Sequence, residues 1–282
     1  MLMYSASSTI AVHALHLTHV FFAESNDFFR LVAAFPRLTD LSLTAVYWTR
    51  LSSQPSSSIC LPWGNNSVIL HKLDVSTDFT STVLEWLTRS SFKLRPHFLF
   101  LKWTHKPKDN AVLRYILREA GTSLRTLRLC GEYDTFHGQM ISSTSSTADS
   151  LLSCNTQLHA LFLYHALCDF TKLSGDVTST SALPWISFVL SRLNSTSLRQ
   201  LDIIFTTDTV VDRIVAWGWA ELDDVLSHLV TKVPELIISI YLESFLGGQA
   251  VSRSGGVQAH KGVSAQDKNE TQNETRSSAP EV

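Results

Sequence analysis

The stretch Leu124-Arg125-Thr126-Leu127-Arg128-Leu129 decides the expected fold, because its apolar residues stand at the first, fourth and sixth positions. The alternation at its end is typical of a β-strand with one buried face. The same spacing recurs at seven other places, of which those at Phe98 and Ile237 have an ambiguous register. These places are Val12–Leu15–Leu17, Leu38–Leu41–Leu43, Leu70–Leu73–Val75, Phe98–Leu101–Trp103, Leu158–Leu161–Leu163, Leu198–Leu201–Ile203 and Ile237–Ile240–Leu242.

The segments between these phrases have the apolar period of helices. We expect helices over residues 26–34, 80–88, 110–120, 183–193 and 219–230. The middle apolar residues of consecutive phrases lie between 26 and 40 residues apart, which is long and irregular for leucine-rich repeats of roughly 20–29 residues. Strands that alternate with helices at such intervals predict parallel strands joined by helical crossovers.

The expected fold class is α/β, an irregular leucine-rich-repeat-like solenoid of about eight repeats over residues 1–246. Its parallel strands should form the concave face and its helices the convex face. A single strand–helix unit cannot bury its own apolar face, so stacked units must share a continuous core. Residues 247–282 contain few large apolar side chains and are predicted to be a disordered tail. The Ser- and Thr-rich residues 142–150 are predicted to be a surface loop.

Several phrases resemble the leucine-rich-repeat regions of fungal F-box proteins. Phe35-Pro36-Arg37-Leu38-Thr39-Asp40-Leu41-Ser42-Leu43 is similar to the FPxLxxLxL phrase of these regions. The stretches Ser123–Leu129 and Ser197–Ile203 resemble the same phrase with Ser in place of Phe-Pro. The stretch Trp219–Leu226, followed by Val233–Leu236, resembles the last helix and strand that these proteins often carry.

The resemblance covers residues 10 to 245 and implies the substrate-recognition region of an F-box-type ubiquitin ligase adaptor. Other subunits of such a ligase transfer the ubiquitin. Family members usually carry a helical F-box ahead of the repeats, whereas the first phrase here begins at Val12. The chain is therefore expected to be a truncated or orphan repeat domain, with ubiquitin-ligase subunits as partners only if an F-box lies upstream.

Composition and motifs argue against several other classes of protein. A net charge of −2 provides no bulk attraction to nucleic acid or to anionic membranes. No apolar run approaches the roughly 18–20 residues of a membrane span, and the N-terminus lacks the basic region of a signal peptide. Four cysteines without a CxxC pair predict free thiols inside the cell, in either cytoplasm or nucleus.

No sequence motif predicts catalysis, a cofactor or a metal site. The phosphate-binding GxxxxGK[ST] loop, the GxSxG elbow and the HExxH zinc motif are all missing. His13, His16 and His19 could share a helix face and bind zinc, but the apolar residues between them fit a strand, so surface histidines are expected. Asp223 and Asp224 are expected on a solvated helix face, because catalytic carboxylates need a cleft that shifts their pKa.

The polar residues between the apolar ones should point to the concave face. The central position of each phrase is expected to hold His16, Ser42, Asp74, Lys102, Arg128, Phe162, Asp202 and Tyr241. Asp40, Lys72 and Tyr164 flank this row. Aromatic and Arg side chains are frequent anchors of protein interfaces. The sequence therefore predicts a strip that binds a protein or peptide and consists of Lys102, Arg128, Phe162, Tyr164, Asp74 and Asp202.

Three interpretations of function remain open at this stage. The first is a protein-interaction scaffold without catalytic activity, in which the strip binds the partner. The second is a truncated or orphan repeat domain with no ligase role, whose sheet face is merely exposed. The third is an enzyme whose site has no recognised motif, which would require a deep pocket with converging titratable groups.

Overall fold

The molecule is built around an open, parallel sheet of eight strands. The computed structural model describes residues 11–50, 68–90, 92–103, 107–131, 152–167, 183–207 and 219–244. The order of the strands in the sheet follows their order in the chain, and every neighbouring pair is parallel. These strands are β1 (Ala14–Thr18), β3 (Asp40–Thr44), β5 (Val68–Ser76), β6 (Phe92–Trp103), β7 (Thr126–Gly131), β8 (Ala160–Leu167), β9 (Gln200–Thr207) and β10 (Ile237–Ser244).

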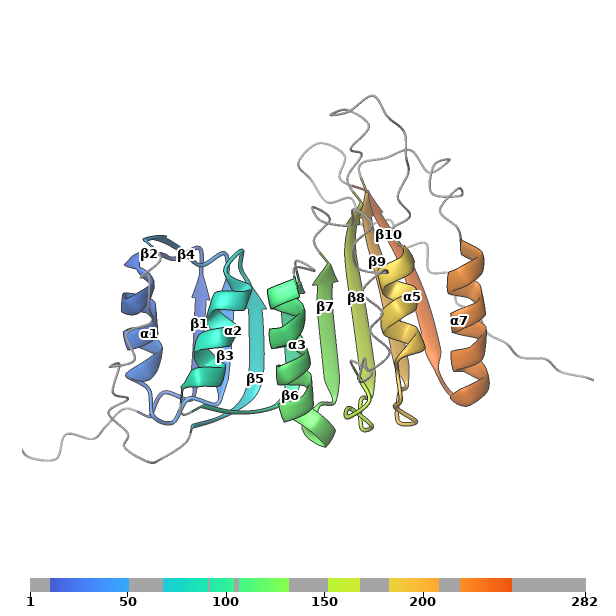
Figure 1. Cartoon of the computed structure of the whole chain (residues 1–282), viewed down its shortest axis with the longest axis horizontal. Coiled ribbons are helices and arrows are strands. Elements are labelled where there is room, and N and C mark those ends of the chain that lie inside the picture. The colour runs from blue at the N-terminus through green and yellow to red at the C-terminus, as the bar shows by residue number, and fades with distance from the viewer. Residues whose placement is uncertain are drawn as a thin grey trace, which may run out of the picture.

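The helices all cover the same side of this sheet in the part of the chain that is described (Figure 1). They are α1 (Ser25–Ala33), α2 (Thr80–Arg89), α3 (Pro107–Ala120), α5 (Leu183–Ser191) and α7 (Trp219–Lys232). Each begins and ends within three residues of the range expected from the sequence, and each connects one parallel strand to a later one. The predicted alternation of parallel strands and helical crossovers is therefore confirmed for the connections that contain these helices; residues 51–67 and 132–151, which precede β5 and β8, lie outside the described residues.

Two short elements complete the described structure. Strands β2 (Phe21–Glu24) and β4 (Tyr47–Arg50) form a separate parallel pair beside α1. A 3-10 turn, η1 (Gly121–Ser123), ends α3, and Gly121 there has a φ of 48°, a backbone conformation that favours glycine. The predicted loop 142–150 and the predicted tail 247–282 lie outside the described residues, as do Cys60 and Cys168.

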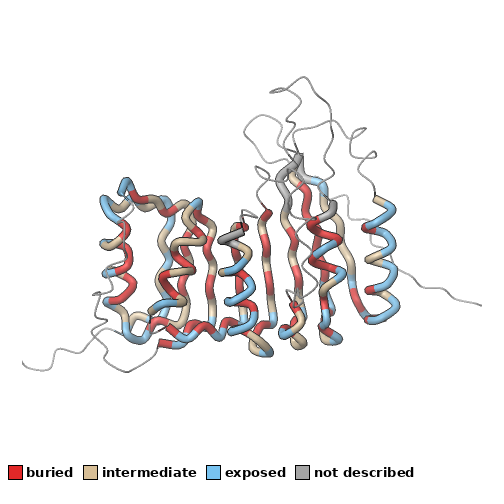
Figure 2. The backbone as a smooth tube through the Cα atoms, viewed as in Figure 1, coloured by how far each residue is buried: buried red, intermediate tan, exposed pale blue. Residues whose placement is uncertain are grey.

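The apolar residues of the phrases form continuous rows across the sheet. Leu41, Leu73 and Leu127 belong to one such row, and all three are fully buried. They point toward the helices, whose residues Phe28 and Ile116 belong to the same hydrophobic cluster. Figure 2 shows how buried and less buried positions alternate along the strands. Burial on one face therefore fixes the register of each strand, because a slip by one residue would expose its apolar set.

The predicted register of β6 was wrong by two residues. Leu99, and not Leu101, lies opposite Leu127. The cause is Pro96, which occupies the first position of this phrase, where six of the other seven phrases carry an aliphatic residue. The spacing therefore predicts a start at the apolar Phe98, two residues too late. The central position of β6 is consequently Phe100, which lies opposite Arg128.

The predicted register of β10 was wrong by the same amount. Ile238 lies opposite Leu201, which places Ser239 in the central position of this strand. Because a shift of two residues keeps every side chain on its own face, Lys102 and Tyr241 still belong to the predicted face. They lie one step nearer the C-terminal ends of the strands than expected.

Buried polar side chains connect one unit to the preceding unit. The Asn155 amide donates to the carbonyl oxygens of Leu117 and Gly121, at 2.9 and 3.0 Å. The Ser195 hydroxyl lies 2.8 Å from the carbonyl oxygen of Leu158, to which it donates. These bonds satisfy carbonyl groups at the turns between units, where helix ends leave acceptors without partners.

We expect Leu127→Ala to lower the free energy of unfolding by about 3 kcal/mol, since it leaves a cavity among rigid neighbours. Thr126→Ala, on the opposite face of the same strand, should change it by no more than about 0.5 kcal/mol. Urea denaturation followed by circular dichroism measures both. Equal losses in the two variants would contradict the assignment of the faces.

Candidate interaction surface

The sheet face opposite the helices, here called the sheet face, is organised in three rows. The central row runs across all eight strands. It consists of His16, Ser42, Asp74, Phe100, Arg128, Phe162, Asp202 and Ser239. The C-terminal row contains Lys102, Cys130, Tyr164, Ile204 and Tyr241. The N-terminal row contains Ala14, Asp40, Lys72, Phe98, Thr126, Ala160, Gln200 and Ile237.

Arg128 lies at the centre of a group of cations and aromatic rings. Its guanidinium carbon is 4.5 Å from the ring centre of Phe162 and 5.3 Å from that of Phe98. The Lys72 ammonium lies 5.4 Å from the same Phe98 ring. Each such contact contributes about 0.5–2 kcal/mol, depending on how far it is desolvated. The Arg128 side chain is therefore held in place by contacts within the sheet face.

The structure brings together five of the six predicted strip residues and adds two aromatic rings. Phe100 lies between Asp74 and Arg128 in the central row, and its ring centre is 6.1 Å from that of Tyr164. Neither Phe98 nor Phe100 was predicted as part of the strip, because the sequence alone did not give the register of β6. Only an alignment of Leu99 with the leucines of the neighbouring strands would have revealed them.

Asp202 is a buried acid on this face. Only 6% of its surface is exposed, and one carboxylate oxygen accepts a hydrogen bond from Gln200 Nε2 at 2.9 Å. Its Oδ1 is buried and has no hydrogen-bond partner in the described part of the chain. Burial raises the pKa of Asp202, while the Gln200 hydrogen bond and the Arg128 charge act in the opposite direction.

Asp74 mirrors Asp202 on the other side of Arg128. Burial raises its pKa as well, and the Ser42 hydroxyl and the charges of Lys72, Arg128 and His16 counteract this rise. The central row from β5 to β9 thus reads acid, aromatic, cation, aromatic, acid. This alternation gives the middle of the sheet face a specific pattern of charges, in which an aromatic ring separates the central cation from the acid on either side.

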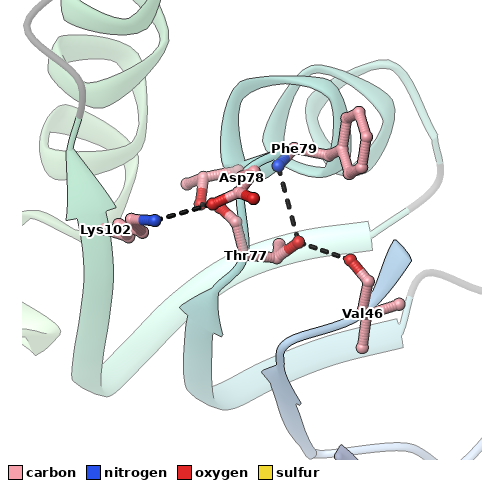
Figure 3. A network of polar contacts seen from close by, with 6 residues as sticks. Val46, Thr77, Asp78, Phe79 and Lys102 are labelled. Carbon is pink, nitrogen blue, oxygen red and sulfur yellow. Dashed lines mark hydrogen bonds and ion pairs between the residues drawn. The ribbon is translucent and has the colours of Figure 1, made fainter. Parts of the chain in front are cut away.

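Lys102 differs from the other predicted strip residues, because it is tied to the turn before α2. Its ammonium lies 2.7 Å from Asp78 Oδ1 (Figure 3). The neighbouring Thr77 hydroxyl donates to the carbonyl oxygen of Val46 at 2.6 Å and accepts from the Phe79 amide at 3.4 Å. Lys102 therefore lies at the C-terminal edge of the sheet face and is not among the cations and rings that surround Arg128.

The other residues considered from the sequence do not converge. Of His13, His16 and His19, only His16 lies within β1. The described residues contain no group of three His, Cys, Asp or Glu side chains that could hold a metal ion. Asp223 and Asp224 are exposed on α7. No helix among the described elements is long and apolar enough to span a membrane.

The variant Asp202→Asn should gain free energy of unfolding relative to the native chain, and this gain should grow as the pH rises. The folded-state pKa of Asp202 lies above its ordinary value of 3.8, so the folded protein binds this proton more tightly than the unfolded chain. This tighter proton binding stabilises the fold fully below pH 3.8, and the stabilisation is lost as the pH rises through the folded-state pKa. The Asn side chain cannot ionise and escapes this loss.

Urea midpoints at pH 4 and pH 7.5 test this prediction, with the exposed Asp224→Asn as control. The difference between Asp202→Asn and the native chain should grow toward pH 7.5, whereas the Asp224→Asn difference should stay constant. A constant difference for both variants would mean that the burial of Asp202 has no electrostatic consequence.

Comparison of the chain with protein-family models, with curated proteins and with solved structures finds no match in any of the three. The chemistry of the sheet face is therefore the basis for assigning a function. That face offers an arginine held against two aromatic rings, with the half-buried Asp74 and the buried Asp202 two strands away on either side.

Proposed function

We propose that this chain is a leucine-rich-repeat-like solenoid that acts as a protein-interaction scaffold and binds its partner on the sheet face over β6, β7 and β8. The observation that carries the proposal is the Arg128 guanidinium, held over Phe162 and Phe98 in the middle of the face that no described helix covers. Arginine and aromatic side chains dominate the binding energy of protein interfaces.

Support for a solenoid comes from the sequential strand order. Each described strand of the large sheet pairs only with the strands before and after it in that order. The crossover helices lie on one side, and their apolar residues join the same core as the strands. Such nearest-neighbour packing is the defining property of repeat proteins, whose exposed sheet forms an extended binding surface.

The expected mode of recognition follows from the fixed geometry of the Arg128 group. An arginine already stacked on rings loses little side-chain entropy on binding, and its remaining N–H groups suit a carboxylate or a carbonyl of the partner. Asp74 and Asp202 disfavour partners that would place an acid above them, because like charges across an interface repel. The function proposed is recognition without catalysis or cofactor.

The resemblance to fungal F-box proteins extends the proposal to a substrate-recognition role in a ubiquitin ligase. The phrase from Phe35 to Leu43 carries this resemblance, and it forms the turn after α1 together with most of β3. Its residues Leu38, Leu41 and Leu43 are fully buried, as a repeat phrase requires. In this role the chain would work inside the cell, and other subunits would transfer the ubiquitin.

A peptide-display selection against the purified chain tests the scaffold proposal. Peptides selected on the native chain should bind the double variant Arg128→Ala/Phe162→Ala at least about tenfold more weakly, because the loss of an anchor residue costs 2 kcal/mol or more. Affinities are measured by isothermal titration calorimetry with three or more independent peptides.

The chain provides a matched control on its helix side. Arg118 lies 6.0 Å from the ring centre of Tyr115 on α3, which is the same kind of contact on the opposite face. The variant Arg118→Ala/Tyr115→Ala should leave peptide affinity unchanged. If this control loses affinity and the sheet-face variant does not, the binding surface lies on the helices and the proposal is wrong.

A further inference from the structure

A further row of side chains, outside the three rows of the sheet face, lies at the N-terminal edge of the sheet. Each of its residues comes directly before a residue of the N-terminal row. On five consecutive strands, β5 to β9, this position holds an imidazole or a guanidinium group. We call these residues the edge ladder: His71, His97, Arg125, His159 and Arg199. The apolar periodicity from which strands are predicted gives no information on this position, so none of the five residues belongs to the predicted strip.

Backbone hydrogen bonds hold the ladder in register. The Arg125 amide donates to the His97 carbonyl at 2.9 Å, the His159 amide to the Arg125 carbonyl at 2.8 Å, and the Arg199 amide to the His159 carbonyl at 2.8 Å. The His71 and His97 rings are stacked, with centres 5.3 Å apart and an angle of 9° between their planes. The five side chains therefore follow one another along a single edge.

All five side chains are exposed, and each bears N–H groups. His97 Nδ1 lies 3.0 Å from the Ser123 carbonyl oxygen, to which it donates, so that its Nε2 is not used by this bond. Arg125 donates to Gln157 Oε1 at 2.9 Å through one of its nitrogens. The ladder itself contains no acidic residue, although Glu235 lies 3.4 Å from Arg199 Nε at its end.

We propose that the edge ladder binds an acidic peptide segment, which lies across the N-terminal ends of β5 to β9. Neighbouring strands are about 4.8 Å apart, so the five positions span about 19 Å. Carboxylates are the natural complement of such a row, because hydrogen bonds from imidazolium and guanidinium groups to carboxylates are about twice as strong as neutral ones. This site is separate from the sheet face and does not depend on its proposed function.

The permanent charge of the ladder favours a peptide over a nucleic acid. Only Arg125 and Arg199 carry a charge at every pH, and Arg199 already faces Glu235. Nucleic-acid binding draws its affinity from many phosphate contacts made by Lys and Arg, and the chain as a whole has a net charge of −2. A short acidic segment needs only a few matched donors.

Fluorescence anisotropy with a labelled twelve-residue Glu- and Asp-rich peptide at pH 6 tests the proposal. The double variant Arg125→Gln/His159→Gln removes two adjacent exposed donors and should bind the peptide about tenfold more weakly, since a charged hydrogen bond contributes about 1.5–3 kcal/mol. The sheet-face variant Arg128→Ala/Phe162→Ala should bind it like the native chain.

A control with the same change in charge is Arg118→Gln/His228→Gln, whose two residues are exposed on α3 and α7. It should bind the peptide within about twofold of the native chain if position rather than net charge matters. Equal losses in the ladder variant and this control overturn the proposal. So does an absence of peptide binding, or tighter binding of a twelve-nucleotide single-stranded DNA than of the peptide.

Discussion

The alignment of leucines across parallel strands is the constraint on which the rest of this structure depends. Leu73, Leu127 and Leu161 are fully buried because the helices cover their side of the sheet. A slip of any strand by one residue would turn these side chains to solvent, at a cost of about 2 kcal/mol or more for each. The same alignment places Arg128 opposite both Phe100 and Phe162. The polar surfaces are therefore positioned by apolar burial on the other side.

Three polar atoms of the central row are buried without a hydrogen-bond partner in the described chain. They are Asp74 Oδ1, Asp202 Oδ1 and Arg128 Nε. Such groups destabilise the isolated fold, and natural structures retain them where recognition or catalysis uses them. The concentration of three of them in one row is what separates this face from an ordinary exposed sheet.

Much of the fold could be predicted from the sequence, because helix and strand periods differ and each phrase repeats the same spacing. The positions of Arg128, Phe162 and Asp202 on one face followed from that spacing alone. The registers of β6 and β10 could not be predicted, since Pro96 and Glu235 replace the aliphatic residue that marks the start of the other phrases. Phe98 and Phe100 were missed for that reason.

The constant step between strands determines how such a surface can change. Consecutive phrases lie between 26 and 40 residues apart in the sequence, yet each strand lies beside the next at a spacing of about 4.8 Å. The variable residues are confined to the connections. An insertion there leaves the distance from Arg128 to Asp202 unchanged, whereas the gain or loss of a whole unit between them would alter it by one strand spacing. The size of ligand that this surface accommodates can therefore evolve only in discrete increments, independently of the length of its connecting segments.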